Sequence, residues 1–418
     1  MPTISLRYGN ATLDLPYNDE QFAVIEDLNK NPPFSDVQIN SRLDMPIGSL
    51  TLEDITADGG TVLFVVPDAT RQVAAGQIVN LMVRRLIANG VAAFDIAVIF
   101  ATGIHRKVTL EERDAILTPF ITQRLKVLDH DPRDLARIVT VGETSCGIPV
   151  ELNRALFEFD HKILIGGISF HYFAGFTGGR KLICPGLASK RTIGATHKLA
   201  FDCETMSRRG GVGTGLLQGN AVHEAFVEAA SLARPSFLVN TMVDDQGRAT
   251  DIHCGDWLAS HKAACEAFEK KNSLRLPERR DVVIASCGGF PYDINLIQAH
   301  KTLDNASAAC NDGGTIILLA DCRDGLGNKN FMKWFTQGDS TRIASELCKR
   351  YEVNGQTAWS LMQKTERHKV YMVTGLDEMT VKQMGMTKLG SVELSRFIRS
   401  ENRRGYILPR GAKAAIRV

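Results

Sequence analysis

The sequence predicts two α/β domains with largely parallel sheets, and three observations carry this expectation. Short apolar runs rich in Val and Ile recur without polar alternation, which is typical of strands covered on both faces. Amphipathic helical patterns lie between these runs, and strand and helix in alternation indicate an α/β fold. The length of 418 residues exceeds the usual size of one domain.

Seven apolar runs are expected to be strands. They are residues 61–67, 95–101, 137–142, 162–167, 281–286, 315–320 and 369–375. Three segments have apolar residues at helical spacing, namely residues 73–88, 219–234 and 257–271. The first of these helices should end at Asn89-Gly90, a common C-terminal stop.

A polar stretch with one proline, residues 270–281, is the expected domain boundary. We therefore expect an N-terminal α/β domain over residues 1–272 and a C-terminal α/β domain over residues 273–418, with the active site in the cleft between them. The histidine candidates discussed below, His105, His171 and His197, lie in the first range, and the candidates Gln298 and Lys301 lie in the second.

Composition argues against several classes of partner. The net charge of +2 and the lack of long basic runs predict no binding to nucleic acid. No apolar stretch approaches membrane-spanning length, and the first residues do not have the pattern of a signal peptide. The nine cysteines form no Cys-x-x-Cys pair, so neither a zinc knuckle nor a disulfide framework is expected, and a cytoplasmic location fits best.

Polar residues gather after four of the expected strands. The segments are PDATR (67–71), ATGIHR (101–106), ISFHYFAGFTGGRK (168–181) and CGGFPYD (287–293). Ligands of open parallel sheets bind beyond the carboxyl ends of the strands, so we expect a shared site there rather than merely solvated loops.

The glycine-rich segment at 168–181 is not a known nucleotide loop. Arg180 separates Gly179 from Lys181 and no hydroxyl residue follows, so the P-loop pattern fails, and the dinucleotide fingerprint is missing as well. Gly178 and Gly179 would still offer backbone N–H groups to a phosphate. Lys181 beside them could pair with that phosphate, bond covalently to a cofactor carbonyl, or be an ordinary surface lysine.

Several further residues are candidates for binding or proton chemistry. His105 and His171 follow different strands and together suggest proton transfer near neutral pH. His197 is a weak metal candidate by itself, with Thr192 and Thr196 as possible helix caps. Gln298 and Lys301 share one face of a helix expected over residues 292–306, which suits a carboxylate but also a solvated surface.

These segments together resemble the nickel-pincer lactate racemase family across nearly the whole chain. The resemblance rests on PDATR, ATGIHR, SFHYFAGFTGGRKLICPG, the ATH at 195–197, the segment from Gln298 to Lys301, and DCRDGLG at 321–327. It implies a nickel-pincer pyridinium mononucleotide attached covalently at Lys181, with nickel held by His197 and by the cofactor's own donors, in a square-planar arrangement that suits nickel(II).

The resemblance also implies roles for the other residues. His105 and His171 are expected to be the two proton donor/acceptors of a reversible hydride transfer that inverts the C2 stereocentre of a 2-hydroxy acid. Gln298 and Lys301 are expected to bind the substrate, and Trp359 to pack near the site. The cofactor-contacting positions are expected to be Asp68, Ala69, Thr70, Arg71 and Pro185. Cofactor-biosynthesis proteins are the expected partners.

One departure from the family pattern leaves the substrate open. Ile297 stands where lactate-specific members have an aromatic residue, so lactate, a longer aliphatic or aromatic 2-hydroxy acid, malate and a sugar acid all remain candidates. Three other functions are also compatible with the residues alone. They are a pyridoxal-phosphate racemase, a dehydrogenase with a freely exchanging nicotinamide, and an anion- or cofactor-binding protein without turnover.

Overall fold

The computed structural model describes residues 2–25, 31–413 and 415–418, and the chain forms two compact units. The large unit comprises Lys30–Ala200 and Gly210–Lys270, and the composite unit comprises Met1–Asn29, Phe201–Arg209 and Lys271–Val418. The division at Lys270 falls beside the polar segment chosen from the sequence. The composite unit differs from the expected domain because two earlier chain segments belong to it.

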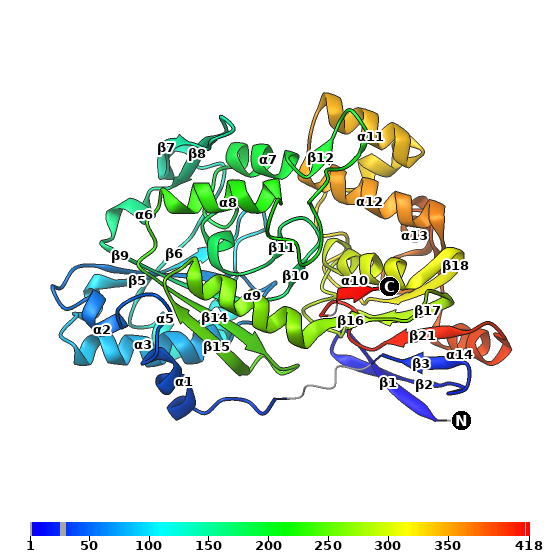
Figure 1. Ribbon diagram of the computed structural model, residues 1–418, viewed down its shortest axis with the longest axis horizontal. Helices are drawn as coiled ribbons and strands as arrows, with labels where there is room; N and C mark the ends of the chain where they lie inside the picture. Colours follow the sequence, from blue (N-terminus) through cyan, green and yellow to red (C-terminus); the bar gives the residue numbers. More distant parts are fainter. Residues whose placement is uncertain (1, 26–30, 414) are drawn as a thin grey trace. The chain divides into compact units, whose positions relative to one another are not determined.

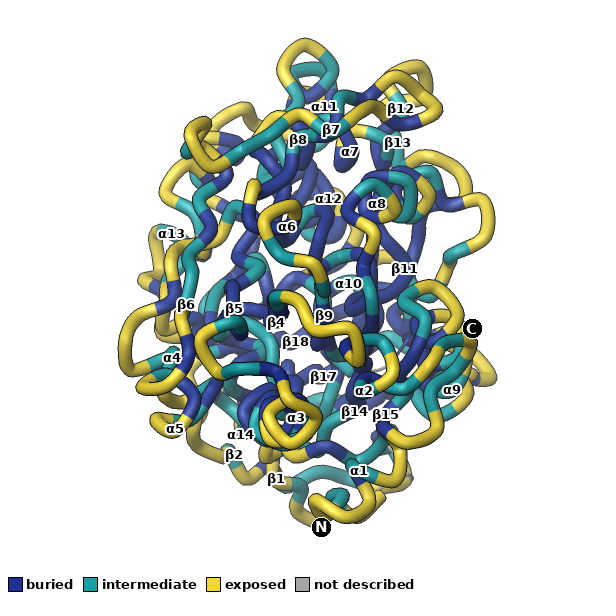
Figure 2. Tube along the Cα trace, turned by 90° about the vertical axis from the view of Figure 1, so that its left-hand side faces the viewer, coloured by how far each residue is buried: buried dark blue, intermediate teal, exposed yellow. Residues whose placement is uncertain are grey.

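A six-stranded sheet forms the centre of the large unit (Figure 1). Five strands are parallel, and β15 at one edge runs antiparallel to β14. The order is β15 (Ala249–Gly255), β14 (Phe237–Val243), β9 (His161–Gly167), β4 (Val62–Pro67), β5 (Ile96–Ala101) and β6 (Lys126–Leu128). Figure 2 shows the trace of β4 in the buried colour, as expected for a strand with apolar side chains on both faces.

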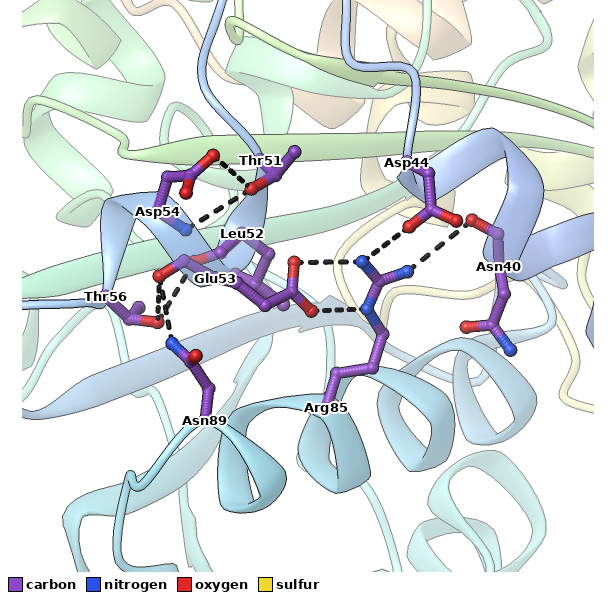
Figure 3. A network of polar contacts seen from close by, with 9 residues as sticks. All are labelled: Asn40, Asp44, Thr51, Leu52, Glu53, Asp54, Thr56, Arg85 and Asn89. Atoms are coloured by element: carbon purple, nitrogen blue, oxygen red, sulfur yellow. Dashed lines mark hydrogen bonds and ion pairs between the residues drawn. The ribbon is translucent and has the colours of Figure 1, made fainter.

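Helices accompany this sheet. They are α1 (Asp36–Leu43), α2 (Leu52–Ile55), α3 (Ala75–Ala88), α4 (Leu110–Leu117), α5 (Pro119–Thr122), α6 (Ala155–Glu158), α7 (Lys190–Lys198), α8 (Ala221–Ser231) and α9 (Ala259–Asn272). The last turn of α3 is tied to α1 and α2 by Arg85, whose guanidinium lies 2.7 Å from Asp44 and 2.5 Å from Glu53 (Figure 3). The network fixes three helices with one cation.

One expected strand lies outside the central sheet. The run RIVTVG forms β7 (Ile138–Glu143), which pairs antiparallel with β8 (Pro149–Asn153) in a separate hairpin. Its residues are partly or fully exposed rather than buried on both faces. A short apolar run does not by itself reveal which sheet it joins, and the expectation of a parallel core strand here was wrong.

The composite unit has its own six-stranded sheet, and all of its strands are parallel. The order is β20 (Thr387–Lys388), β19 (Lys369–Val373), β18 (Cys310–Leu319), β17 (Arg280–Ser286), β21 (Gly405–Leu408) and β3 (Phe22–Val24). Strand β3 comes from the start of the chain. Its Phe22 packs with Leu6 and Leu15 against Ile284 and Ile317, so N-terminal residues complete this core.

Further elements surround the sheet of the composite unit. Its helices are α10 (Leu296–Ala309), α11 (Ser340–Lys349), α12 (Val353–Arg367), α13 (Glu378–Gln383) and α14 (Ser391–Ser400). Two-stranded pairs are β1 (Thr3–Tyr8) with β2 (Ala11–Pro16), β12 (Phe201–Asp202) with β13 (Ser207–Arg208), and β16 (Ser273–Arg275) with β22 (Ala415–Arg417).

Two expectations are corrected in the composite unit. Helix α10 begins at Leu296 rather than at Tyr292, because the side chain of Asn295 accepts a hydrogen bond from the amide of Gln298 and caps the first turn. Cys203 and Cys348 form a disulfide across a sequence separation of 145, although the sequence indicated no disulfide. Spacing along the chain does not reveal a pair so far apart.

Among the described residues, no helix is long and apolar enough to cross a membrane.

Candidate functional site

The turn after β4 holds Asp68 in a fixed orientation. Asp68 Oδ1 accepts hydrogen bonds from the amide and the hydroxyl of Thr70 at 3.0 and 2.6 Å. Ala69 and Arg71 lie in the same turn, and Arg71 donates to the carbonyl of Thr70 at 3.1 Å. The DATR segment is therefore a rigid turn at the carboxyl end of a core strand.

His105, in the loop after β5, is bound to this turn. Its Nδ1 lies 2.6 Å from Asp68 Oδ2, and its side chain is 39% exposed while that of Asp68 is 7% exposed. Burial alone would raise the pKa of Asp68, but the adjacent His105, the bond from Thr70 and the charge of Arg71 lower it to about 2. Asp68 is thus a carboxylate at neutral pH and accepts a hydrogen bond from the Nδ1–H of His105.

His171 ends the short strand β10 (Phe170–His171), which pairs with β11 (Gly175–Phe176). The amides of Phe173 and Ala174 both donate to His171 Nδ1, each at 3.2 Å. A nitrogen that accepts from two N–H groups carries no proton itself, so in the neutral ring the proton is on Nε2. His171 is buried, and its ring stacks on Tyr172 with centroids 5.3 Å apart.

Lys181 lies in a short 3-10 helix, Gly179–Leu182, which follows the glycine pair. Gly178 and Gly179 have φ values of 75° and 51°, a region that favours glycine. Burial, followed by the charges of Arg180 and Arg71, lowers the pKa of Lys181 well below its usual value. The amine is therefore held in an environment that favours its neutral, nucleophilic form.

His197 is buried in the last turn of α7 with one nitrogen committed. Its Nδ1 donates to the carbonyl of Ile193 at 2.8 Å, which leaves Nε2 as the nitrogen with a lone pair. Burial and then the charge of Lys181 lower the pKa of His197 to about 3, so the ring is neutral at neutral pH. The helix is capped by Ser189, which accepts from the amide of Thr192, so the expected capping by Thr192 or Thr196 was wrong.

Phe226 of α8 links two of these residues and was missed in the sequence. Lys181 Nζ lies 5.5 Å from the centre of its ring, and the His197 ring lies 5.2 Å from it. Lys181 and His197, 16 residues apart in the chain, therefore share one aromatic neighbour. A lone Phe in an amphipathic helix gives no signal of such a role, because the same pattern serves any core contact.

Gly186, which follows Pro185 in the chain, connects the lysine region to the loop after β5. The amide of Gly103 donates to the carbonyl of Gly186 at 2.9 Å, and the amide of Gly186 donates to the carbonyl of Lys181 at 3.0 Å. Within the large unit, the loops carrying His105, Lys181 and Pro185 are thus joined by backbone hydrogen bonds.

Gln298 and Lys301 belong to the composite unit. Lys301 Nζ donates to Gln298 Oε1 at 2.7 Å on α10, which orients the two side chains together. Ile297 is partly buried against the core of this unit, and Trp359 packs edge-to-face on Phe201 with centroids 5.0 Å apart. The amide and the amine of Gln298 and Lys301 are thus held as one polar pair on a helix with a packed apolar side.

The donor set suits a metal that brings its own ligands. Among the described residues, no group of three or more His, Cys, Asp or Glu side chains could hold a metal ion. His197 presents a neutral, buried nitrogen, with the amine of Lys181 near it. One such histidine beside a buried lysine is compatible with a metal cofactor that brings its own ligands.

Comparison with known proteins identifies the family of the chain. The family model for the lactate racemase N-terminal domain matches residues 8–208, and that for the lactate racemase C-terminal domain matches residues 277–403. The lactate racemase of Thermoanaerobacterium thermosaccharolyticum is 29% identical over 432 residues, covering 100% of both chains. The lactate racemase of Lactiplantibacillus plantarum is 32% identical over 335 residues, covering 79% of this chain and 77% of that protein.

Solved structures give the same result for the fold. The lactate racemase apoprotein from T. thermosaccharolyticum superposes with a TM-score of 0.88 at 28% identity, with 100% of both chains covered. A protein from Thermotoga maritima superposes with a TM-score of 0.72 at 18% identity, covering 93% of this chain and 100% of that one, which shows a shared fold. The chain therefore belongs to the lactate racemase family of isomerases.

Proposed function

We propose that the chain inverts the C2 stereocentre of a 2-hydroxy acid, with His105 and His171 as the two proton donor/acceptors. The observation that carries this proposal is the opposite hydrogen bonding of the two rings. His105 Nδ1–H donates a hydrogen bond to Asp68, and His171 Nδ1 accepts hydrogen bonds from two backbone N–H groups. In the neutral forms of the two rings, Nε2 of His105 is unprotonated and Nε2 of His171 is protonated.

This difference assigns a starting role to each histidine. Removing a hydroxyl proton requires an acceptor, and the Nε2 of His105 is one, with Asp68 stabilising the imidazolium that results. Protonating the oxygen again after inversion requires a donor, and the Nε2–H of His171 is one. The proton that His105 took is released to solvent and His171 regains one from solvent, which restores two neutral rings. The reverse reaction runs the same transfers backwards, with the His105 imidazolium as donor and the deprotonated Nε2 of His171 as acceptor, so each histidine serves one stereoisomer.

The residues of the large unit support a nickel-pincer nucleotide as cofactor. The amine of Lys181 would form the covalent attachment, and the Nε2 of His197 would bind the metal. Asp68, Ala69, Thr70, Arg71 and Pro185 would contact the nucleotide. The amide of Gly179 donates to Asn240 Oδ1, so this glycine does not offer its N–H to the phosphate as the sequence suggested. When bound, the cofactor would supply a reversible hydride acceptor.

Gln298 and Lys301 would bind the substrate carboxylate. The ammonium of Lys301 gives charge, and the amide N–H of Gln298 gives direction, so the pair suits a planar carboxylate. Lactate is the named substrate of the curated relatives, and it is the first compound to test here. Because Ile297 is aliphatic, longer 2-hydroxy acids are the next compounds to test.

The test is to produce the chain together with cofactor-biosynthesis proteins. We expect an added mass located on Lys181, nickel bound in proportion to it, and racemisation of at least one compound in a panel of 2-hydroxy acids. His105→Ala and His171→Ala should each abolish racemisation while the added mass and nickel remain. An unmodified Lys181 without nickel contradicts the cofactor assignment, and visible imine absorbance without nickel indicates pyridoxal phosphate instead. Loading without turnover on any compound indicates a carrier.

A further inference from the structure

A fully buried cation lies directly beside the lysine. The side chain of Arg180 is 1% exposed, and among the ion pairs of the described residues none involves it. Burying a charge without a counter-charge costs several kcal/mol unless its hydrogen bonds are well satisfied. We therefore expect the hydrogen bonds of Arg180 to have a structural role that a smaller apolar residue could not fill.

Those donors bind the loop from within. We call residues 174–182 the lysine loop. Arg180 Nη2 donates to the carbonyl of Ala174 at 2.7 Å, and Nη1 lies 3.5 and 3.4 Å from the carbonyls of Thr177 and Gly178. One planar guanidinium thus spans the loop from its first residue to the glycine pair, which a lysine or a methionine could not do.

His261 of α9 completes the arrangement. Its Nε2 lies 2.8 Å from Arg180 Nη1, and because a guanidinium only donates, Nε2 is the acceptor. Nε2 is also 3.1 Å from the carbonyl of Thr177, a contact that is not a hydrogen bond when Nε2 carries no proton. The ring packs on the backbone of Gly179, where an added Cβ would lie 2.5 Å from His261 Cδ2.

The sheet holds the loop from another direction. Asn240 in β14 accepts the amide of Gly179 at 3.2 Å, and a Cβ added at Gly178 would lie 2.6 Å from the same Asn240 oxygen. Successive residues of a 3-10 helix point about 120° apart. Fixing Arg180 inward therefore also fixes the direction of Lys181, whose amine lies 5.5 Å from the Phe226 ring.

We infer that Arg180 and His261 form a positioning pair that fixes the lysine loop and directs Lys181 toward the attachment point of the cofactor. The inference rests on the proposed function for the attachment, but the hold on the loop can be measured without cofactor. Both residues contact the lysine loop, so both are inferred to act through Lys181.

The test uses the full chain and two pairs of variants. Arg180→Met removes the donors and keeps most of the bulk, and Arg85→Met makes the same change on α3, where the partners are Glu53 and Asp44. His261→Gln keeps an acceptor for Arg180, and His261→Leu has similar volume without one. The measurements are amide hydrogen exchange of the lysine loop in cofactor-free protein, covalent mass added at Lys181 after co-production, and the melting temperature.

We expect loop exchange to accelerate at least about tenfold in Arg180→Met and His261→Leu, because hydrogen bonds to a charged group are lost. Attachment should fall by at least about tenfold in the same two variants. Arg85→Met and His261→Gln should resemble the wild type in both readouts, even if their melting temperatures fall. If Arg180→Met does not fold, the two His261 variants decide the matter.

The inference is overturned if the loop exchanges at the wild-type rate in folded Arg180→Met, or if His261→Leu and His261→Gln behave alike. It is also overturned if attachment is unchanged in a variant whose loop has been released. An unmodified Lys181 in the wild-type chain is a different failure. It refutes the attachment, and with it the proposed function, while exchange still reports whether the pair holds the loop.

Discussion

At the scale of single residues, the proposed function depends on which nitrogen of each histidine carries a proton. Asp68 decides this for His105, and the amides of Phe173 and Ala174 decide it for His171. Side-chain type was visible in the sequence, and so was the position after a strand. The partner of each ring was not, because Asp68 reaches His105 from a different strand end, 37 residues earlier.

The Asp68→Asn variant should therefore lose most of its racemisation activity while its cofactor remains attached. The amide can present N–H to His105 Nδ1, which stabilises the wrong tautomer and removes the counter-charge of the imidazolium. We expect the rate of racemisation to fall by on the order of a thousandfold or more. Asp129→Asn, which removes a carboxylate bound to Arg113 elsewhere in the large unit, is the control. A wild-type rate in the loaded Asp68→Asn enzyme would show that the pairing has no part in proton transfer.

The same carboxyl group should make stability depend on pH. The folded pKa of Asp68 is about 2 against an ordinary value of 3.8, so the unfolded chain binds its proton first as the pH falls. This stabilisation is complete above about pH 4 and is lost as the pH falls toward 2, and it amounts to about 2 kcal/mol. Unfolding by denaturant at a series of pH values should show the wild type losing this increment relative to Asp68→Asn. Parallel curves for the two proteins would contradict the assignment.

At the scale of elements, the lysine loop shows how a helix and a sheet confine a short backbone segment. Gly179→Ala should cost about 1–3 kcal/mol in the free energy of unfolding, because φ is positive there and the new Cβ meets the His261 ring. Gly194→Ala is the matched change in α7, where an added Cβ meets no atom within 4 Å. It should stabilise the chain by about 0.5–1 kcal/mol, since alanine favours a helix. Equal melting temperatures for the two variants would contradict the packing described.

The disulfide is the element-scale feature of the composite unit. Cys203 lies in the turn between β12 and β13, and Cys348 lies in α11. Cys348→Ser should lower the melting temperature of oxidised protein, and the chain-entropy contribution is at most about 5 kcal/mol for a loop of this length. A thiol reductant should bring the wild type to the level of the variant. Peptide mapping without reductant that finds both thiols free would contradict the pairing.

Local sequence was a good guide to strands in the centres of the two sheets. The runs that form β4, β5, β9, β17 and β18 are apolar on both faces, and a run of consecutive apolar residues reveals this property locally. The run that became β7 looked similar but forms a hairpin, because strand partnership depends on residues far away. The start of α10 was misplaced for a more local reason, the cap at Asn295.

At the scale of the whole molecule, the grouping of segments in space differs from their order along the chain. The composite unit gathers Met1–Asn29, Phe201–Arg209 and Lys271–Val418, whereas the boundary expected from the sequence groups the first two segments with residues 30–200. The amino-acid composition does not indicate that these two early segments pack with the C-terminal residues. Candidate residues that lie within loops at strand ends were easier to find than their supports, since His261, Asn240 and Phe226 come from elements far along the chain.

The packing of N-terminal residues in the core of the composite unit has a measurable consequence. Phe22 is 1% exposed and packs in the core of the composite unit, more than 250 residues before β17. Phe22→Ala should cost about 3–5 kcal/mol, because it leaves a cavity against Ile284 and Ile317. Hydrogen exchange should accelerate in β17 and β18 and stay unchanged in β4, whereas Phe64→Ala in the large unit should show the reverse. If Phe22→Ala instead loosens β4, the N-terminal strand belongs to the large unit and the composite core is wrong.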